Sequence, residues 1–440
     1  MKILILSARD LRGGAARAAY RLHQGLLTAQ VDSQMLVQNK LSDCYSVIAP
    51  KSKIQRGIAA MKPALDQLPL NLYRHRDRAI NIYSSQWLPN NLVTQIEQIN
   101  PDVINLHWVN GGFVPIEALS KLKQPLVWTL HDMWAFTGGC HYSGTCDRYM
   151  QSCGACPQLG SRRQQDLSYW NWRRKTKAWH NLNLTVVTPS QWLASCAQSS
   201  SLFQNFPVQV IGNGIDPQLY QPHDPLFARK VFNLPTDKKI ILFGALNSTQ
   251  DRRKGFNLLL PALEHLKSTE YASQIELVIF GASEPSQPIN FGFKTHYVGQ
   301  LSDDVALSLL YAAADVFVAP SLQDNLPNTV LEALFCATPC AAFKIGGMPD
   351  LIEHQQNGYL AQPEQPQDLA QGIDWILADD TRHQYLRSNS RAKAIANFNL
   401  KQQTQRYLEV FTHRLINGSE TSASCSITLS GVSPPTGSGF

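Results

Sequence analysis

The sequence predicts an α/β protein with two parallel-sheet domains that face each other across a cleft. Short β-branched and apolar runs alternate with helix-length segments, which is typical of βαβ units. The chain has 440 residues, more than one hydrophobic core usually supports. A polar, proline-bearing stretch from Asn213 to Pro235 divides the series near its middle. We therefore expect two doubly wound domains.

The first domain is expected over residues 1–214. A loop containing Gly13 and Gly14 follows its first strand and opens a helix of small residues, so unpaired amides there can meet an anionic ligand. A tight loop that only packs is the alternative. The order G-x-G-x-x-G is missing, which argues against a nicotinamide dehydrogenase. The predicted strands of this domain are Lys2 to Ser7, Gln34 to Val37, Val103 to His107, Leu126 to His131, Thr185 to Pro189 and Val208 to Asn213.

The second domain is expected over residues 215–400, because Asn213-Gly214-Ile215-Asp216-Pro217 has the turn chemistry of a linker. Residues 401–416 permit a helix that can recross to the first domain. Residues 417–440 are rich in Ser, Thr, Gly and Pro and are expected to form a disordered tail. The predicted strands are Lys239 to Gly244, Glu276 to Gly281, Asp315 to Pro320, Cys340 to Phe343 and Gly358 to Leu360.

Three segments of the second domain place polar groups just beyond strand ends. Asp324 and Glu332 stand eight positions apart across a strand-to-helix turn, the basic run 252–254 follows another strand, and Gly346-Gly347 follows a third. The ligand crevice of an open parallel sheet forms at this edge. Each segment alone fits a solvated surface or a plain turn. Together they favour a site for a polyhydroxyl ligand that carries a diphosphate.

A histidine in the first domain is a candidate for acid–base chemistry at this crevice. His131 ends a predicted strand, and its unperturbed pKa of about 6.5 suits proton exchange with a hydroxyl or a leaving oxygen. His107 ends the preceding strand and competes for the same role.

Composition limits the class of protein. The net charge of +6 and the pI near 8.8 favour anionic partners, but the basic residues are spread out and do not indicate a nucleic-acid binder. No apolar run approaches the roughly 20 residues that span a bilayer. We expect a cytosolic protein, soluble or peripheral at the inner face of the plasma membrane. Five scattered cysteines suit reduced thiols in a cytosol: Cys44, Cys196, Cys336, Cys340 and Cys425.

The other four cysteines cluster in the loop 134–160. Cys140, Cys146, Cys153 and Cys156 follow the spacing C-x5-C-x6-C-x2-C. A structural zinc site is one interpretation, because four thiolates can bind zinc tetrahedrally. A disulfide-stapled loop and a reduced loop are the alternatives.

The segment from Lys51 to Arg78 is amphipathic and basic. Its apolar residues recur at helical spacing and are interrupted by prolines at 63 and 69. A helix that covers the sheet is the favoured interpretation, and a helix lying on an anionic membrane surface is the alternative. The apolar residues are Ile54, Ile58, Met61, Leu65, Leu68 and Leu72.

As a set, these segments resemble the retaining glycosyltransferases of family four, over nearly the whole chain to about residue 415. The resemblance implies the GT-B architecture, in which two Rossmann-like domains face each other across a cleft. The passage 134–159 looks like a branch associated with exopolysaccharide and colanic-acid-type assembly. Besides the glycine loop, the matching segments are TLHDMW (129–134), PSQWL (189–193), IGNGID (211–216), RKG (253–255), PSLQDNLPNTVLEAL (320–334) and GGMPDLI (346–352).

The resemblance implies transfer of a hexose from a nucleoside-diphosphate sugar to a saccharide or polyprenyl-linked acceptor, with no cofactor required for catalysis and no nucleic acid involved. A sugar-nucleotide epimerase or phosphorylase on the same fold is one alternative. A non-catalytic sugar-binding protein is another. Donor sugar, base, acceptor and linkage are not specified by these motifs.

The resemblance also assigns roles to residues. Lys254 and Arg253 would bind the diphosphate, Glu332 the ribose, and Asp324 the transferred sugar, with His131 near its anomeric carbon. His131, Lys254 and Asp324 are thus the expected catalytic residues. The remaining donor-binding residues would be Gly13, Gly14, Asn325, Leu326, Gly346 and Gly347.

Two positions depart from the family pattern. Asp324 stands where the family usually has Glu, and Ala245 stands where an arginine is common. Arg252 or Arg253 is a candidate replacement for the missing cation.

Overall fold

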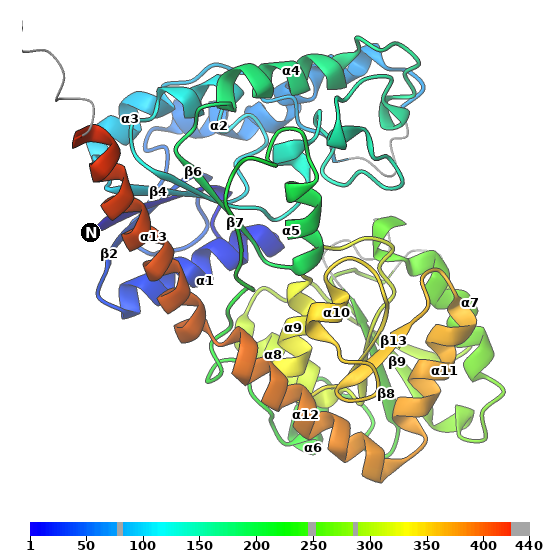
Figure 1. The fold of residues 1–440 in the computed structure, drawn as a ribbon. Helices are drawn as coiled ribbons and strands as arrows, with labels where there is room; N and C mark the ends of the chain where they lie inside the picture. The colour runs from blue at the N-terminus through cyan, green and yellow to red at the C-terminus, as the bar shows by residue number, and fades with distance from the viewer. Residues whose placement is uncertain (77–81, 245–251, 285–288, 424–440) are drawn as a thin grey trace, which may run out of the picture.

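The computed structural model describes residues 1–76, 82–244, 252–284 and 289–423. These residues form two lobes, each built on a parallel sheet with helices on both faces (Figure 1). The two-domain α/β fold expected from the sequence is therefore confirmed. Ala245, Cys425 and residues 424–440 of the expected tail lie outside the described residues.

The N-terminal sheet has seven strands in the described chain, in the order β3-β2-β1-β4-β5-β6-β7, and every neighbouring pair is parallel. The strands are β1 (Lys2–Arg9), β2 (Asp32–Asn39), β3 (Val47–Ile48), β4 (Val103–Leu106), β5 (Leu126–Thr129), β6 (Leu184–Thr188) and β7 (Val208–Val210). The helices are α1 (Gly14–Thr28), α2 (Lys53–Asp66), α3 (Leu92–Ile99), α4 (Leu167–Trp179) and α5 (Gln191–Gln198), with 3-10 turns η1 (Leu68–Leu72), η2 (Ile116–Lys121), η3 (Trp134–Phe136), η4 (Arg148–Met150) and η5 (Pro157–Leu159).

Both faces of this sheet are buried, because successive side chains of a strand point to opposite sides. Ile3 and Ile5 of β1 pack with α1 and with the C-terminal helix α13 (Leu400–Ala423). Leu4 and Leu6 pack on the other side, in a core that includes Trp128 and the helices α3 and α5. Strands buried on both faces read as continuous apolar runs, which is why β1 was recognisable in the sequence.

The C-terminal sheet has six strands in the described chain, in the order β10-β9-β8-β11-β12-β13, again all parallel. The strands are β8 (Lys239–Gly244), β9 (Ile275–Phe280), β10 (Lys294–Gly299), β11 (Val316–Ala319), β12 (Cys340–Phe343) and β13 (Gly358–Ala361). The helices are α6 (Pro225–Val231), α7 (Phe256–Leu266), α8 (Asp304–Ala313), α9 (Asn328–Phe335), α10 (Met348–Leu351), α11 (Pro366–Leu377) and α12 (Asp380–Phe398), with 3-10 turns η6 (Arg252–Lys254) and η7 (Ala272–Gln274).

The chain crosses between the lobes twice, and the two crossings lie side by side. The Ile215 amide donates to Phe398 O at 2.9 Å, and the Leu400 amide donates to Ile215 O at 3.0 Å. Helix α12 covers the C-terminal lobe and α13 continues along the N-terminal lobe (Figure 1). There, the Tyr407 hydroxyl lies 2.9 Å from Thr129 Oγ1. Helix α13 extends to Ala423, past residue 417 where the tail was expected to begin.

Two features differ from the sequence predictions. The edge strands β3 and β10 were missed, since a two-residue strand carries no pattern and β10 has no fully buried residue. The prediction that the apolar stripe of 51–78 packs on the sheet is wrong. Helix α2 buries only Ala59 and Asp66, while Ile54 is 77% exposed.

Candidate functional site

The basic turn after β8 and the acidic loop after β11 meet at one sheet edge. Lys254 Nζ lies 2.7 Å from Asp324 Oδ2, and Arg253 Nη1 lies 3.7 Å from the same oxygen. Strands β8 and β11 are neighbours, so their carboxyl ends bring the two segments together. Burial raises the pKa of Asp324, but Lys254 and Arg253 outweigh burial and lower that pKa below its usual value. Two cations therefore share one ionised carboxylate.

Three glycines allow the backbone to close around this pair. Gly255 has a φ of +71°, and a Cβ there would overlap the carbonyl oxygen of Pro320. A Cβ on Gly346 would overlap Asp324 O, and one on Gly347 would overlap Asn325 O. The Gly347 amide also donates to Asp324 O at 3.3 Å. In this structure Gly346 and Gly347 thus hold the turn that carries Asp324.

Asn325 joins this turn to the N-terminal lobe. Its side-chain Nδ2 donates to Leu130 O at 3.3 Å and to His131 O at 3.2 Å, and its Oδ1 accepts from Ser190 Oγ at 2.6 Å. Its backbone amide donates to Asp324 Oδ1 at 3.0 Å. The next residue, Leu326, is buried. Asn325 therefore orients Asp324 and holds the end of the strand that presents His131 beside it.

His131 is hydrogen-bonded to the histidine that competed with it. His131 Nε2 lies 2.9 Å from His107 Nδ1, and His107 Nε2 lies 2.9 Å from Asn105 Oδ1. Burial lowers the pKa of His131 to about 4 and lowers that of His107 well below its ordinary value. Both rings are therefore neutral near pH 7, and His131 is suited to accept or donate a hydrogen bond there as an uncharged group.

The glycine loop lies next to the start of α9. Gly13 has a φ of +102° with open space around its Cβ position, so the backbone conformation rather than crowding requires glycine. Gly14 O accepts from Asn328 Nδ2 at 2.9 Å. The amino-terminal ends of α1 and α9, each with unpaired amides, thus face the same region between the lobes.

Glu332 is buried and has two partners. Its Oε1 accepts from Arg21 Nη2 at 2.8 Å, and its Oε2 accepts from the Tyr311 hydroxyl at 3.0 Å. Arg21 also donates to the Tyr220 hydroxyl at 3.1 Å. The sequence reasoning missed Arg21. It lies four residues after Arg17, which pairs with Asp304 at 2.5 Å, so one face of α1 contacts the C-terminal lobe through two arginines.

The cysteine loop gives no support to the zinc interpretation. Among the described residues, no three His, Cys, Asp or Glu side chains are arranged to hold a metal ion. The four cysteines of the loop are free thiols. Burial raises the pKa of Cys140, and raises that of Cys153 to about 12. The loop instead contacts buried Lys175, whose Nζ donates to Thr137 O at 2.9 Å and lies 3.6 Å from the centre of the Trp134 ring. Burial lowers the pKa of Lys175 to about 7.

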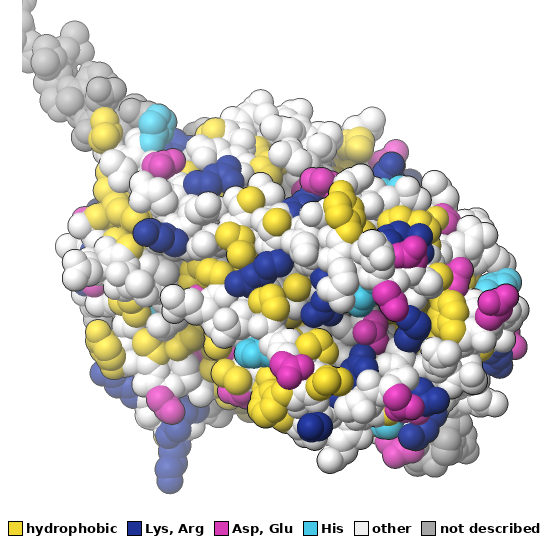
Figure 2. Space-filling model, turned by 90° about the horizontal axis from the view of Figure 1, so that it is seen from below, with side chains coloured by type: hydrophobic (Ala, Val, Ile, Leu, Met, Phe, Trp, Pro, Cys, Tyr) yellow, Lys and Arg dark blue, Asp and Glu magenta, His cyan; other side chains and the backbone are white. Residues whose placement is uncertain are grey.

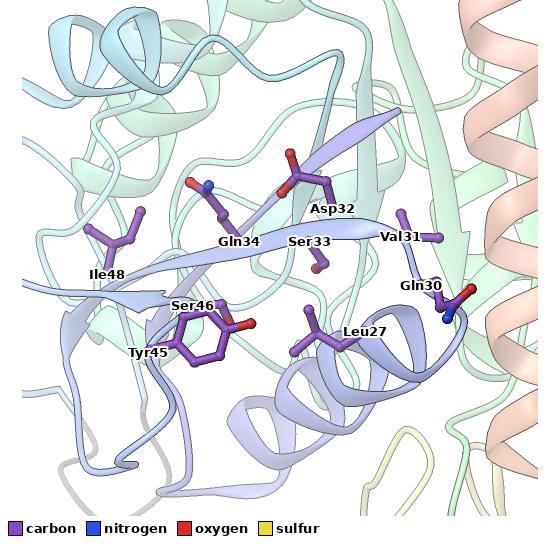
Figure 3. A pocket seen from close by; sticks show the side chains of 9 residues that line it. All are labelled: Leu27, Gln30, Val31, Asp32, Ser33, Gln34, Tyr45, Ser46 and Ile48. Carbon is purple, nitrogen blue, oxygen red and sulfur yellow. The ribbon is translucent and has the colours of Figure 1, made fainter.

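A pocket of about 550 Å³ lies between α1 and β2 of the N-terminal lobe (Figure 3). It is lined by the end of α1, the start of β2 and the residues before β3, including Asp32, Ser33 and Tyr45. None of its lining residues belongs to the predicted site.

The surface agrees with the charge pattern of the sequence. On the face seen in Figure 2, Lys and Arg side chains are scattered among acidic and apolar ones. No helix of the described chain is both long and apolar enough to cross a bilayer.

Family models match both halves of the chain. The model described as Glycosyltransferase Family 4 matches residues 12–219, and the model described as Glycosyl transferases group 1 matches residues 226–393. Each half of the chain is thus similar to a family model of glycosyltransferases.

Curated relatives match over part of the chain. An uncharacterized glycosyltransferase of Methanocaldococcus jannaschii is 28% identical over 195 residues, which is 42% of this chain and 48% of the relative. D-inositol 3-phosphate glycosyltransferase of Xylanimonas cellulosilytica is 29% identical over 202 residues, 42% of this chain and 46% of the relative. The chain spans about half the length of these relatives.

Solved structures match over nearly the whole chain. Sucrose-phosphate synthase of Thermosynechococcus elongatus has a TM-score of 0.67 at 18% identity, covering 94% of this chain and 99% of that one. HepE of Anabaena, solved in complex with UDP-glucose, has a TM-score of 0.63 at 19% identity, covering 94% and 100%. The GT-B fold expected from the motifs is confirmed.

Proposed function

We propose that this protein is a retaining glycosyltransferase that moves a hexose from a nucleoside-diphosphate sugar to a saccharide or lipid-linked saccharide. The observation that carries the proposal is the contact of Lys254 and Arg253 with Asp324, at a turn that Asn325 ties to His131. This turn lies where the carboxyl end of the second sheet meets the first lobe. Matches to glycosyltransferase models in both halves support it.

The chemistry follows from the charges at this turn. As the bond from the sugar to the diphosphate breaks, negative charge grows on the leaving phosphate and positive charge grows on the sugar. Lys254, Arg253 and the unpaired amides at the start of α9 stabilise the leaving group. Asp324 stabilises the sugar. The acceptor hydroxyl attacks the face that the diphosphate leaves and passes its proton to a departing phosphate oxygen, which retains the anomeric configuration.

The remaining assignments belong to the same proposal. Residues 1–214 bind the acceptor, residues 215–400 bind the donor, and Gly13, Gly14, Gly346, Gly347 and Leu326 line the donor site. Glu332 binds the ribose through its carboxylate, which Arg21 and Tyr311 orient. The protein acts in exopolysaccharide synthesis in the cytoplasm, at the inner face of the plasma membrane.

Product analysis tests the transferase assignment. Nucleotide sugars are first screened by thermal shift, because a bound donor stabilises the fold by mass action. The hits are then supplied with the sugar labelled, together with saccharide acceptors, and the anomeric configuration of the product is determined by NMR. Transfer to a second molecule with retained configuration is expected.

Three outcomes would favour the rivals. A labelled nucleotide sugar of changed configuration would indicate an epimerase, and a sugar phosphate formed with inorganic phosphate would indicate a phosphorylase. Donor binding without turnover across the acceptor panel would indicate a sugar-binding protein.

A further inference from the structure

Helix α2 and the turn η1 expose an apolar stripe to solvent. Ile54, Ile58 and Met61 are 77%, 53% and 59% exposed, and Leu68 and Leu72 of η1 are 48% and 84% exposed. The spacing of the first three places them on one side of the helix. Buried Ala59 follows Ile58 by one residue and is rotated by about 100° from it. The stripe therefore faces away from the protein, and we call these five residues the α2 face.

The segment that carries the α2 face is basic, and Lys51, Lys53, Arg56 and Arg74 are exposed. Residues 51–76 contain one acidic residue, Asp66, which is buried and accepts from the amides of Ser85 and Gln86 at 3.2 and 2.6 Å. It therefore takes little part in the surface field. The basic residues of the segment are Lys51, Lys53, Arg56, Lys62, Arg74 and Arg76. An apolar centre with a cationic rim matches the interface of an anionic bilayer.

Helix α2 is connected to the candidate site by a short series of contacts. The Trp87 indole donates to Leu65 O at 3.2 Å, next to the end of α2. Gly111 and Gly112 follow β4 and approach Pro63 and Lys62 of α2. The same strand leads to His107, which contacts His131.

We propose that the α2 face docks on an anionic lipid bilayer, so that a lipid-linked acceptor diffusing in that bilayer reaches the cleft from the His107 side. The docking is argued only from the exposure of the α2 face and the positive charge of its segment. Delivery of the acceptor rests on the proposed function. A helix that buries two of its fourteen residues gains little from intramolecular packing, so its apolar surface is available to the bilayer.

Vesicle sedimentation of the full chain tests the docking. Binding is expected to phosphatidylcholine vesicles that contain about one third phosphatidylglycerol, to weaken at high salt, and to be weak with phosphatidylcholine alone. Ile54→Ser with Ile58→Ser, and separately Lys53→Glu with Arg56→Glu, should each lower the partition coefficient about tenfold or more.

A matched control uses another exposed apolar pair. Leu226 and Phe227 of α6 are 51% and 56% exposed on the other lobe. Leu226→Ser with Phe227→Ser should leave vesicle binding unchanged. If this control variant lost as much vesicle binding as Ile54→Ser with Ile58→Ser, the proposal would be overturned. A shift from dimer to monomer in the α2 variant by ultracentrifugation, without loss of vesicle binding, would assign the face to a second copy of the chain and also overturn it.

Activity separates this proposal from the proposed function. The α2 variants should keep the wild-type rate of donor hydrolysis and of transfer to a soluble saccharide. Suppose that neither the wild type nor the α2 variants turn over any donor, while the wild type binds anionic vesicles through the α2 face. That result would support the docking and refute the transferase assignment.

A second, independent observation concerns the ring of His131. Asn105 Nδ2 lies 3.0 Å from Val127 O, an atom that can only accept, so this side of the amide is the NH₂ group. Asn105 Oδ1 therefore faces His107 Nε2, which must carry a proton. With His107 neutral, its Nδ1 is a lone pair, and only a protonated His131 Nε2 can satisfy it at 2.9 Å.

We infer that Asn105 and His107 are positioning residues that fix His131 as the Nε2–H tautomer and leave its Nδ1 to accept a hydrogen bond from a ligand hydroxyl. The inference rests on the proposed function only for the identity of that hydroxyl. His131 Nδ1 has no hydrogen-bond partner among the described residues. His131 is then a hydrogen-bond acceptor for substrate, and not a proton donor.

Nitrogen-15 NMR of histidine-labelled protein tests the tautomer, with His131→Gln assigning the signal. The expected spectrum has a protonated Nε2 and a bare Nδ1 on His131. His107→Gln keeps an acceptor within reach and should preserve this tautomer, while His107→Leu should yield a mixture and raise the KM for donor more than it lowers kcat. A protonated Nδ1 in the wild-type protein would overturn the inference, whether or not the protein is a transferase.

Discussion

Arg21 Nη2 lies 2.8 Å from Glu332 Oε1. This contact joins α1 of the first lobe to α9 of the second lobe, and α9 begins at the candidate site. Both side chains are at least nine-tenths buried. The Arg17–Asp304 pair lies one helical turn away on α1. The two lobes are thus joined by two ion pairs. Under the proposed function Glu332 also binds the ribose, so donor binding and lobe contact would then involve the same carboxylate.

Removing Arg21 should cost stability. Arg21→Ala leaves the Glu332 carboxylate buried without its cation, and breaking a buried pair in this way costs about 3–5 kcal/mol. Urea unfolding measures the loss. The exposed Arg173→Ala should change the free energy of unfolding by less than about 0.5 kcal/mol. A double-mutant cycle with Glu332→Gln tests the pair directly. The losses in unfolding free energy of the two single variants should sum to more than the loss in the double variant. A double variant that loses the full sum would argue against a direct pair.

Lys254→Ala should abolish most turnover if the proposed function is right. The variant removes one of the two cations beside the leaving group, and such a group is worth on the order of 3 kcal/mol, about a hundredfold in kcat. Steady-state assays with the donor identified by screening measure this. Lys294→Ala is the matched control, because Lys294 is 69% exposed on the edge strand β10. Normal turnover by Lys254→Ala would refute the assignment.

Acid should destabilise the protein through His131. Its pKa is lowered to about 4 in the fold from 6.5, so below pH 6.5 the unfolded chain binds a proton that the folded chain does not. This contribution to stability is full above pH 6.5 and is lost as pH falls toward 4, at about 1 kcal/mol per pH unit. His131→Gln should lose less stability than wild type between pH 7 and pH 5, by about 1–2 kcal/mol.

Chemical denaturation at each pH measures the His131 effect. His180→Gln, which alters an exposed ring, is the control and should follow the wild-type curve. Parallel curves for wild type and His131→Gln would contradict a lowered pKa of His131 in the folded protein.

Two glycines should respond in opposite ways to alanine. Gly255 has a φ of +71° and no room for a Cβ beside Pro320, so Gly255→Ala should cost more than about 2 kcal/mol and displace Lys254. Gly57 lies inside α2 with open space around it, so Gly57→Ala should stabilise by about 0.5–1 kcal/mol. Thermal unfolding of both variants checks the pair. A Gly255→Ala variant as stable as wild type would show that the Gly255 turn relaxes freely, and a destabilised Gly57→Ala would contradict the prediction for α2.

Much of the fold was predictable because it depends on local patterns. The buried strands are continuous apolar runs, and the helix expected over residues 401–416 lies within α13. The meeting of Lys254 with Asp324 was also predictable, since neighbouring parallel strands end at one edge. The edge strands β3 and β10 were not, because strands with exposed residues lose that signal.

Other parts of the site could not be read from the sequence. Gly346 and Gly347 were expected among the donor-binding residues. The structure shows that the Gly347 amide donates to Asp324 O, a contact that depends on how two loops approach each other. The zinc interpretation of the cysteine spacing found no support among the described residues, since spacing along a loop does not fix the direction of its thiols.

The sequence by itself determined the two parallel sheets, the order of their buried strands along the chain and the edge where charged residues gather, because periodicity and strand ends are local properties. Only the tertiary structure decided which partners those residues take. Arg21 and Glu332 are 311 positions apart, and His131 receives its tautomer from a neighbouring strand. The sequence pattern of the α2 stripe is the same for a stripe that faces a core and for one that faces solvent. Only the three-dimensional packing shows that it faces outward.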